Sequence, residues 1–228
     1  MFSEALKCTK VRTTLPKQPL PPNSERAPIK TARLVLRPFV QSDFDGVRAL
    51  RTQPEVMVFT MTGRIDGDLS ETQAKLDASL PPNDVKTFNF TISLSDTDEL
   101  IGTGGVHKVE SALGWPEVGY MFKREHWGKG YATEFMKGFV EAWWKLEREQ
   151  AYMEVESQSI DMDGKAEEVK TVPELLSATI DANNAGSLRV LEKSGFKKFK
   201  TWTEPDARAG FEGMLVTLAG FVLRKETP

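Results

Sequence analysis

The segment EHWGKGYATEFMKGFVEAWW, residues 125–144, places two glycines around a lysine immediately before a long stretch with a helical pattern. Its apolar residues recur at steps of four and one, which predicts a helix with one broad apolar face packed against a sheet. These residues are Tyr131, Phe135, Met136, Phe139, Val140, Trp143 and Trp144. The segment EVGYMF, residues 117–122, directly precedes the loop and is typical of a strand. The sequence therefore predicts a strand, a glycine loop and a helix in direct succession.

The glycine loop, Gly128-Lys129-Gly130, has two interpretations. A helix N-terminus carries free N–H groups and the positive end of the helix dipole, and glycines let a phosphate approach the backbone. The loop is then a cradle for a pyrophosphate. Alternatively, the glycines only make a tight turn between strand and helix. The pattern is not a P-loop, and Thr133 stands where a dinucleotide fingerprint requires glycine.

The rest of the pattern predicts one mixed α/β domain without internal repeats. Alternating and β-rich segments predict strands within residues 31–39, 87–94, 100–109, 117–122, 174–180, 196–202 and 213–225. Helical spacing predicts helices near residues 42–51, 70–80, 131–144 and 184–194. The expected order is a strand, two helices, three strands, the long helix, a strand, a short helix and two final strands.

Two segments fall outside this pattern. Residues 1–30 contain five prolines and six basic residues against two acidic ones, and we expect an N-terminal arm that wraps on the surface. An organellar transit segment is the alternative interpretation. Residues 147–172, EREQAYMEVESQSIDMDGKAEEVKTV, are acidic, polar and long for a connection. We expect them to form an insertion that is either functional or disordered.

Composition narrows the possible partners. The chain has 228 residues and a net charge of −3, so no basic excess points to nucleic acid. No apolar run reaches the roughly 20 residues of a membrane span. Cys8 is the single cysteine, which fits a reducing compartment, and we expect a cytoplasmic protein, with nuclear and organellar locations left open. With one cysteine and only His107 and His126, we expect no metal site.

Two motifs together carry a family resemblance. HWGKGYATE after EVGYMF, followed about fifty residues later by NNAGSLRVLEKSGF, resembles the GNAT superfamily of acetyl-CoA-dependent N-acetyltransferases. The most similar group includes the ribosomal-protein N-terminal (Rim-type) acetyltransferases, and the resemblance covers about residues 31–226. It implies the GNAT fold: a central, mostly antiparallel mixed sheet of six to seven strands, flanked by about four helices, with strands splayed at the acetyl-CoA site.

The resemblance also implies a coenzyme A site. Backbone amides of the glycine loop would hold the pyrophosphate, and the end of the preceding strand would pair with the pantetheine arm. The implied contacts are Met121, Phe122, Lys123, Trp127, Gly128, Lys129, Gly130, Tyr131, Ala132, Thr133, Asn184 and Ser187. Trp127 departs from the family signature, which has Gln or Arg there. Asn184 is alternatively a helix N-cap.

Three residues are candidates for the chemistry. Glu117 lies ten residues before Trp127, where the resemblance implies the general base; the alternative is a strand-end glutamate exposed to water. The backbone N–H of Met121 is the expected donor to the thioester carbonyl. Many family members carry a tyrosine that here falls on Leu191, so we expect Ser187 to be the general acid or thiolate partner. A plain helical serine is the alternative.

The resulting hypothesis is an N-acetyltransferase in which a primary amine attacks acetyl-CoA directly in a ternary complex. The acceptor is either a small amine or a peptide or protein amine, and it is expected against residues 53–68 and 203–212. Their acidic surplus favours a cationic acceptor, unless these are solvated loop charges. A non-catalytic acyl-CoA-binding sensor is the alternative. The apolar C-terminal strand, residues 213–223, is expected to pair across a homodimer if one forms.

Overall fold

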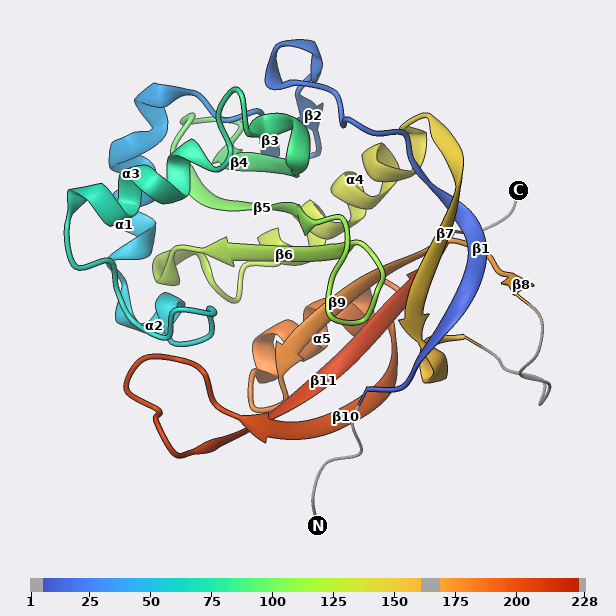
Figure 1. Ribbon diagram of the computed structural model, residues 1–228. Helices are drawn as coiled ribbons and strands as arrows, with labels where there is room; N and C mark the ends of the chain where they lie inside the picture. The colour runs from blue at the N-terminus through green and yellow to red at the C-terminus, as the bar shows by residue number, and fades with distance from the viewer. Residues whose placement is uncertain (1–5, 161–168, 226–228) are drawn as a thin grey trace.

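The computed structural model describes residues 6–160 and 169–225 and contains two sheets (Figure 1). The main sheet has eight strands in the order β10-β11-β9-β6-β5-β4-β3-β2. Their bounds are β2 Ile29–Lys30, β3 Leu34–Arg37, β4 Phe88–Leu94, β5 Leu100–Lys108, β6 Glu117–Phe122, β9 Leu175–Asp181, β10 Lys197–Pro205 and β11 Leu215–Arg224. The second sheet has the order β7-β1-β8, with β1 Cys8–Pro16, β7 Arg148–Glu156 and β8 Lys170–Thr171.

Helices cover both faces of the main sheet (Figure 1). Their bounds are α1 Phe44–Arg51, α2 Pro54–Met57, α3 Leu69–Asp77, α4 Tyr131–Lys145 and α5 Ala185–Lys193. The predicted mixed α/β class, the order of the predicted elements and the mostly antiparallel sheet are confirmed; the two-residue β2, the single-turn α2 and the second sheet of β1, β7 and β8 are additions. No helix in the described ranges is long and apolar enough to cross a membrane.

The predicted apolar face of α4 is buried against the sheet. Phe135, Met136, Phe139 and Trp143 are all fully buried. The ring of Phe139 packs against Phe88 and Phe90 of β4, with centroid distances of 5.9 and 6.2 Å. Burial of large aromatic side chains is a major source of stability, so this contact fixes where the N-terminus of α4 lies.

β6 and β9 are the parallel neighbours in the main sheet, and they are joined at one position only. Glu117 pairs with Ser177, and the Ser177 N–H donates to the Pro116 carbonyl at 2.8 Å. Beyond this pair the strands diverge (Figure 1). Each follows a different antiparallel partner, because β6 pairs along its length with β5 and β9 with β11. The result is a V-shaped opening within the sheet, as the resemblance implied.

The expectation of an irregular segment at 147–172 is wrong for β7. β1 and β7 pair antiparallel over nine positions, from Cys8 with Glu156 to Pro16 with Arg148. A local pattern did not reveal either strand, because the outer face of each segment is polar. Its pairing partner also lies about 140 residues away in the chain. Residues 161–168 of the same segment lie outside the described residues.

The N-terminal arm is part of the packed structure, not a surface tail. Val11 of β1 is buried in a second core with Trp115, Met153, Val155, Ile160 and Leu175. Leu20, also in the arm, is buried in the main core. The predicted division of the chain near residue 30, into an arm and a catalytic-type domain, stays a prediction.

The C-terminal strand cannot pair with a second copy in the way we expected. β11 lies between β9 and β10 and is hydrogen-bonded to both. A strand can add to a sheet only at a free edge, so this route to a dimer is closed.

The second core gives a stability prediction. Val11→Ala should lower the free energy of unfolding by about 2 kcal/mol, because it leaves a cavity beside Trp115. Lys10→Ala is the matched control on the same strand: its ammonium lies 3.8 Å from Glu154 and both side chains are exposed. We expect a change within about 0.5 kcal/mol for the control. Equal urea-unfolding midpoints for the two variants would contradict the packing of β1.

Candidate active site

Because β6 and β9 are paired at one position only, the backbone groups of β6 beyond Glu117 that face β9 have no strand partner on that side. The Lys123 N–H donates to the Ile101 carbonyl of β5 at 2.8 Å, and the register runs in step from Gly102–Phe122 to Val106–Val118. In an antiparallel ladder, alternate residues direct their N–H and C=O to the same neighbour. Met121 therefore faces β5 with its backbone groups, whereas Tyr120 and Phe122 face the opening.

This register bears on two of the expected contacts. The Met121 N–H is directed to β5 and away from β9, and its role as donor to the thioester carbonyl stays a prediction. The Lys123 N–H is also taken, by Ile101. Phe122 has the available N–H at this end of the strand. The pattern of alternating side chains could not reveal this, because hydrogen-bond direction depends on which neighbour a strand pairs with.

Trp127 connects the loop to the strand. Its indole Nε1–H donates to the Phe122 carbonyl at 2.7 Å, and 44% of the residue stays exposed. The side chain that replaces Gln or Arg of the family signature thus anchors the glycine loop on the open edge of β6. This hydrogen bond explains how the loop stays attached to β6 although tryptophan occupies the first position of the family signature.

The glycine loop needs both of its glycines. Gly128 and Gly130 have φ angles of 74° and 83°, in the left-handed region that other residues rarely adopt. The Glu134 N–H bonds to the Gly130 carbonyl at 3.1 Å and begins α4. Among the described residues, no protein atom accepts a hydrogen bond from the backbone N–H groups of residues 128–133.

The loop can accommodate an anion. A Cβ built on Gly128 would meet nothing within 4 Å, so the backbone is open on that side. The free N–H groups and the dipole of the fifteen-residue α4 favour negative charge there. The structure thus brings the predicted contacts 127–133 together beside the open end of β6, in an arrangement that fits a pyrophosphate.

Arg33 is a loop residue that the sequence patterns did not single out. Its guanidinium lies 4.5 Å from the Tyr131 ring centre, and Nη1 donates to the Lys129 carbonyl at 3.1 Å. Its Nε donates to Glu134 at 2.7 Å. Burial acts to raise the pKa of Glu134, but hydrogen bonds from Thr31 and Arg33 hold it below its ordinary value. Arg33 therefore ties the loop to the first turn of α4.

Glu117 lies on the face of β6 that carries the odd-numbered side chains. Its side chain is 13% exposed, which argues against the alternative of a water-exposed strand end. Glu117 Oε1 lies 3.5 Å from His107 Nε2 of β5, and the His107 side chain is 39% exposed. A Cβ on Gly119 would approach the His107 ring to 3.1 Å, so glycine makes room for the imidazole. His107 is a second site residue that the patterns missed.

Tyr120 and Ser187 meet on the opposite face of β6. The Tyr120 hydroxyl donates to Ser187 Oγ at 3.1 Å, and the Tyr120 ring packs 6.0 Å from that of Phe135 of α4. Burial raises the pKa of Tyr120 to about 12, while the bond to Ser187 lowers it slightly. The Asn184 side chain accepts from the Ser187 N–H at 3.0 Å, so the N-cap interpretation of Asn184 is confirmed.

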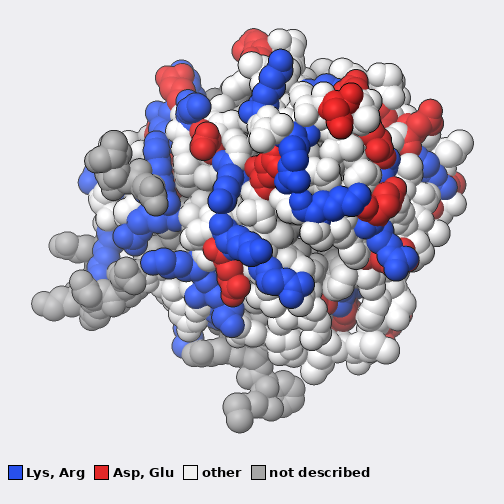
Figure 2. Space-filling view, turned by 180° about the vertical axis from the view of Figure 1, so that it is seen from behind, with Lys and Arg blue, Asp and Glu red and all other residues white. Residues whose placement is uncertain are grey.

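The surface on the side of α4 and α5 carries many basic side chains. Figure 2 shows this side, with Lys and Arg spread across it and carboxylates among them. Exposed basic residues on and near the two helices are Lys129, Lys137, Arg189, Lys193, Lys197 and Lys198. A phosphate-bearing ligand at the glycine loop would lie in a favourable potential here.

The expected acceptor segments contact each other, but their acidic surplus is largely neutralised. Arg208 Nη1 donates to the Val58 carbonyl at 2.9 Å. Asp66 pairs with Arg51 at 2.7 Å, and Asp206 pairs with Arg208 at 2.6 Å. Glu55 likewise pairs with Arg124 at 2.7 Å. The charge count therefore gives little support for a cationic acceptor. Apolar side chains are exposed instead: Phe59, Met61 and Ile65.

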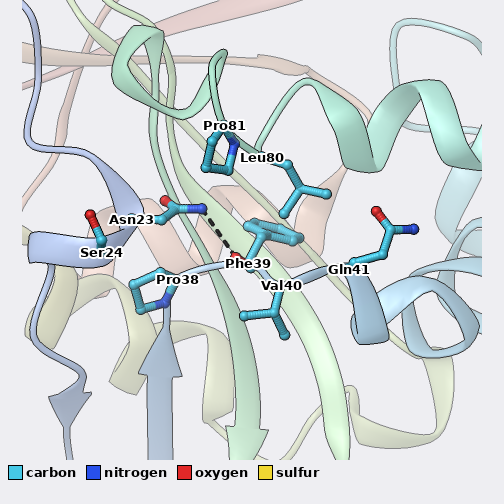
Figure 3. Close-up of a pocket in the computed structure, with 8 residues that line it drawn as sticks. All are labelled: Asn23, Ser24, Pro38, Phe39, Val40, Gln41, Leu80 and Pro81. Carbon is cyan, nitrogen blue, oxygen red and sulfur yellow. Dashed lines mark hydrogen bonds between the residues drawn. The ribbon is translucent and has the colours of Figure 1, made fainter.

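Two other features of the described residues lie outside the candidate site. A shallow apolar hollow of about 440 Å³ is lined by Asn23, Ser24, Pro38, Phe39, Val40, Gln41, Leu80 and Pro81 (Figure 3). None of the predicted site residues lines it. Glu99, Glu125 and His126 bring ligand atoms within 4.8 Å of one another, but Lys123 Nζ already lies 3.4 Å from Glu99.

Comparison with known protein families and curated proteins gives consistent matches. Residues 33–197, more than half of the chain, match the family described as an acetyltransferase (GNAT) domain. The chain is similar to an uncharacterized N-acetyltransferase, p20, from Bacillus licheniformis, with 32% identity over 114 residues. That match covers 49% of this chain and 62% of the relative, so the chain spans less than two thirds of the relative's length.

Solved structures show the same fold. A GNAT-family acetyltransferase from Bacillus anthracis has a TM-score of 0.62 and 19% identity, over 87% of this chain and 98% of that one. The microcin C7 self-immunity acetyltransferase MccE, in complex with acetyl-CoA and AMP, has a TM-score of 0.61 and 12% identity. The match covers 85% of this chain and 93% of that one. A spermidine N-acetyltransferase from Vibrio cholerae, in complex with CoA and spermine, has a TM-score of 0.60 and 13% identity. The match covers 84% of this chain and 95% of that one. At these identities the likeness concerns the fold alone.

The role of Arg33 can be tested by hydrogen exchange. Arg33→Ala should speed exchange of the Glu134 and Phe135 amides, because the first turn of α4 loses its tie to the loop. Global stability should fall by no more than about 1 kcal/mol, since the Arg33 side chain is half exposed. Arg64→Ala is the control: Arg64 pairs with Glu71 at the same 2.7 Å and is equally exposed, 49% against 48%. Unchanged exchange at both amides in Arg33→Ala would exclude this role.

Proposed function

The chain belongs to the GNAT acetyltransferase family, and we propose that it is an acetyl-CoA-dependent N-acetyltransferase acting on a primary amine. The observation that carries the proposal is the arrangement of β6, β9 and α4. Two parallel strands joined only at Glu117 and Ser177 open beside a helix N-terminus whose N–H groups are free. An extended thioester arm fits the opening as an added strand, and its diphosphate fits the helix end.

The residues that would hold acetyl-CoA follow from this arrangement. The N–H groups of residues 128–133 would bind the pyrophosphate, and the basic side chains near α5 would favour the remaining phosphate. The N–H groups of Tyr120 and Phe122 face the opening and would bind the arm. The cosubstrate supplies an acetyl group already activated as a thioester.

The two faces of β6 divide the chemistry. Glu117, on one face, takes a proton from the attacking amine in a ternary complex. A backbone N–H of β6 on the side facing β9, that of Tyr120 or Phe122, would stabilise negative charge on the carbonyl oxygen. Ser187, on the other face, lies at the first turn of α5, where its hydroxyl can stabilise the departing sulfur. Contact between Glu117 and the exposed His107 offers the abstracted proton a route to water.

For the acceptor, we infer a peptide or protein amine. Phe59, Met61 and Ile65 expose apolar surface on the segment expected to contact the acceptor, while Glu55 and Asp66 of that segment are ion-paired. Exposed apolar side chains that gather near a site are typical of a surface that binds another macromolecule. A small polycation would instead need unpaired carboxylates.

The proposed base gives the first functional prediction. Glu117→Gln should lower kcat near neutral pH by about 10² to 10⁴-fold, because the amine loses its proton acceptor. The loss should shrink toward about pH 9, where more of the amine is already neutral. The measurement is thiol release from acetyl-CoA with a panel of peptide α-amines, polyamines and amino sugars.

Glu110→Gln is the matched control for this experiment. Glu110 is an exposed glutamate in the connection from β5 to β6, and its change should leave kcat within twofold. Equal rates for Glu117→Gln and Glu110→Gln would exclude Glu117 as the base. Turnover of polyamines but not peptides would overturn the acceptor class, and binding of acetyl-CoA without any turnover would favour a sensor.

The glycine loop gives the second prediction. Gly128→Ala and Gly210→Ala place alanine at φ angles of 74° and 86°, and neither methyl group meets a neighbour within 4 Å. Both should lose about 1 kcal/mol of stability through backbone strain. Only Gly128→Ala should weaken coenzyme A binding, at least about tenfold by calorimetry, because its methyl group would stand where the pyrophosphate approaches the backbone. The same Kd in both variants would show that the loop is only a turn.

A further inference from the structure

Tyr120 and Ser187 form a hydroxyl pair on one face of β6, and the family resemblance gave a role to Ser187 but none to Tyr120. Tyr120 lies on β6, three residues beyond the Glu117–Ser177 pair that closes the V. Ser187 lies in the first turn of α5, which follows β9. The 3.1 Å bond between their hydroxyl oxygens therefore joins β6 to α5, the helix that follows β9.

The direction of this bond determines what Ser187 can do. The Tyr120 hydroxyl donates its proton and Ser187 Oγ accepts it. Within residues 6–160 and 169–225, no protein atom accepts a hydrogen bond from Ser187 Oγ, so the serine proton is free for a ligand. A neutral hydroxyl whose lone pair is occupied by a donor is polarised and becomes a better donor itself.

The surroundings of Tyr120 keep it in the donor role. Its ring packs against Phe122 and Phe135, with centroid distances of 6.0 Å to each. This burial raises the pKa of Tyr120 to about 12, so the phenol stays protonated at any pH at which the protein works. A tyrosinate would accept the serine proton and remove it from the ligand; an apolar pocket prevents this.

We propose that Tyr120 is a positioning residue of the transfer reaction: it orients Ser187 so that the serine hydroxyl donates a hydrogen bond to the sulfur of coenzyme A. This inference rests on the proposed function. When the amine nitrogen bonds to the acetyl carbon, the carbon–sulfur bond breaks and its electron pair stays on sulfur. The amine proton goes to Glu117. Ser187 and Tyr120 keep their protons and stabilise the thiolate, so no further reactant is needed.

The test measures the bound thiol directly and requires no acceptor. Free coenzyme A is bound to the protein, and thiolate absorbance is followed as pH is raised. The wild-type complex should show a thiol pKa about one unit or more below that of unbound coenzyme A, which corresponds to at least about a tenfold preference for thiolate. Tyr120→Phe and Ser187→Ala should each remove most of this shift, and the double variant should lose no more than the larger single loss.

Two control variants remove the same groups elsewhere. Tyr152→Phe changes an exposed tyrosine of β7, and Ser194→Ala changes a serine at the C-terminal end of α5. Both should leave the bound thiol pKa unchanged. Tyr120→Phe keeps the aromatic packing, and Ser187→Ala tests the same bond from the other side if one variant does not fold.

A second readout uses the amine that the panel identifies. Tyr120→Phe should lower kcat about tenfold and leave the KM for acetyl-CoA within twofold, as expected when an interaction forms mainly in the transition state. A thiol pKa in Tyr120→Phe equal to that of the wild type overturns the inference, even if the enzyme is active. Absence of coenzyme A binding in the wild type overturns the proposed function itself and this inference with it.

Discussion

The contact between Glu117 and Ser177 is the constraint on which the active-site geometry depends. It holds two parallel strands together at one end and nowhere else. A fully paired sheet would use the N–H groups of Tyr120 and Phe122 within the fold and would leave no room for an arm between the strands. A sheet with no pair at all would let the two halves move independently. One pair keeps the opening narrow at its base and gives it a fixed direction.

The same strand, β6, places Glu117 and Tyr120 on opposite faces of the sheet. Side chains of a strand alternate between faces, so Glu117 and Tyr120 point to opposite sides of the sheet although they are three residues apart. In the proposed reaction, one face would present a carboxylate to the amine, and the other would present hydroxyl groups to the leaving sulfur. The backbone N–H groups of Tyr120 and Phe122 lie in the plane of the sheet and are directed toward β9. The chemistry is thus ordered by the pleat of a six-residue strand.

The second core supports the base of the opening from behind. Trp115, just before Pro116 and Glu117, is fully buried against Val11 of the N-terminal arm and Val155 of β7. Its indole Nε1–H donates to Ser159 Oγ at 2.8 Å. The Trp115 and Pro116 carbonyls both accept from the Ser177 hydroxyl, at 3.3 and 3.0 Å. The arm and β7 therefore hold the segment that carries the proposed base, although they lie far from the opening.

The sequence by itself determined the elements whose signals are local. The apolar face of α4, the glycine loop before it and the order of the strands and helices follow from spacing within short segments, whereas Glu117 and Ser187 were singled out by the family resemblance. Only the tertiary structure decided which backbone N–H groups of β6 face β9 rather than β5, because that depends on the partner strand. It also decided that β1 pairs with β7, that Arg33 contacts the glycine loop, that His107 lies beside Glu117 and that Tyr120 bonds to Ser187. In each of these cases the contacting groups lie far apart in the chain or depend on the direction of a hydrogen bond, and a local pattern contains neither kind of information.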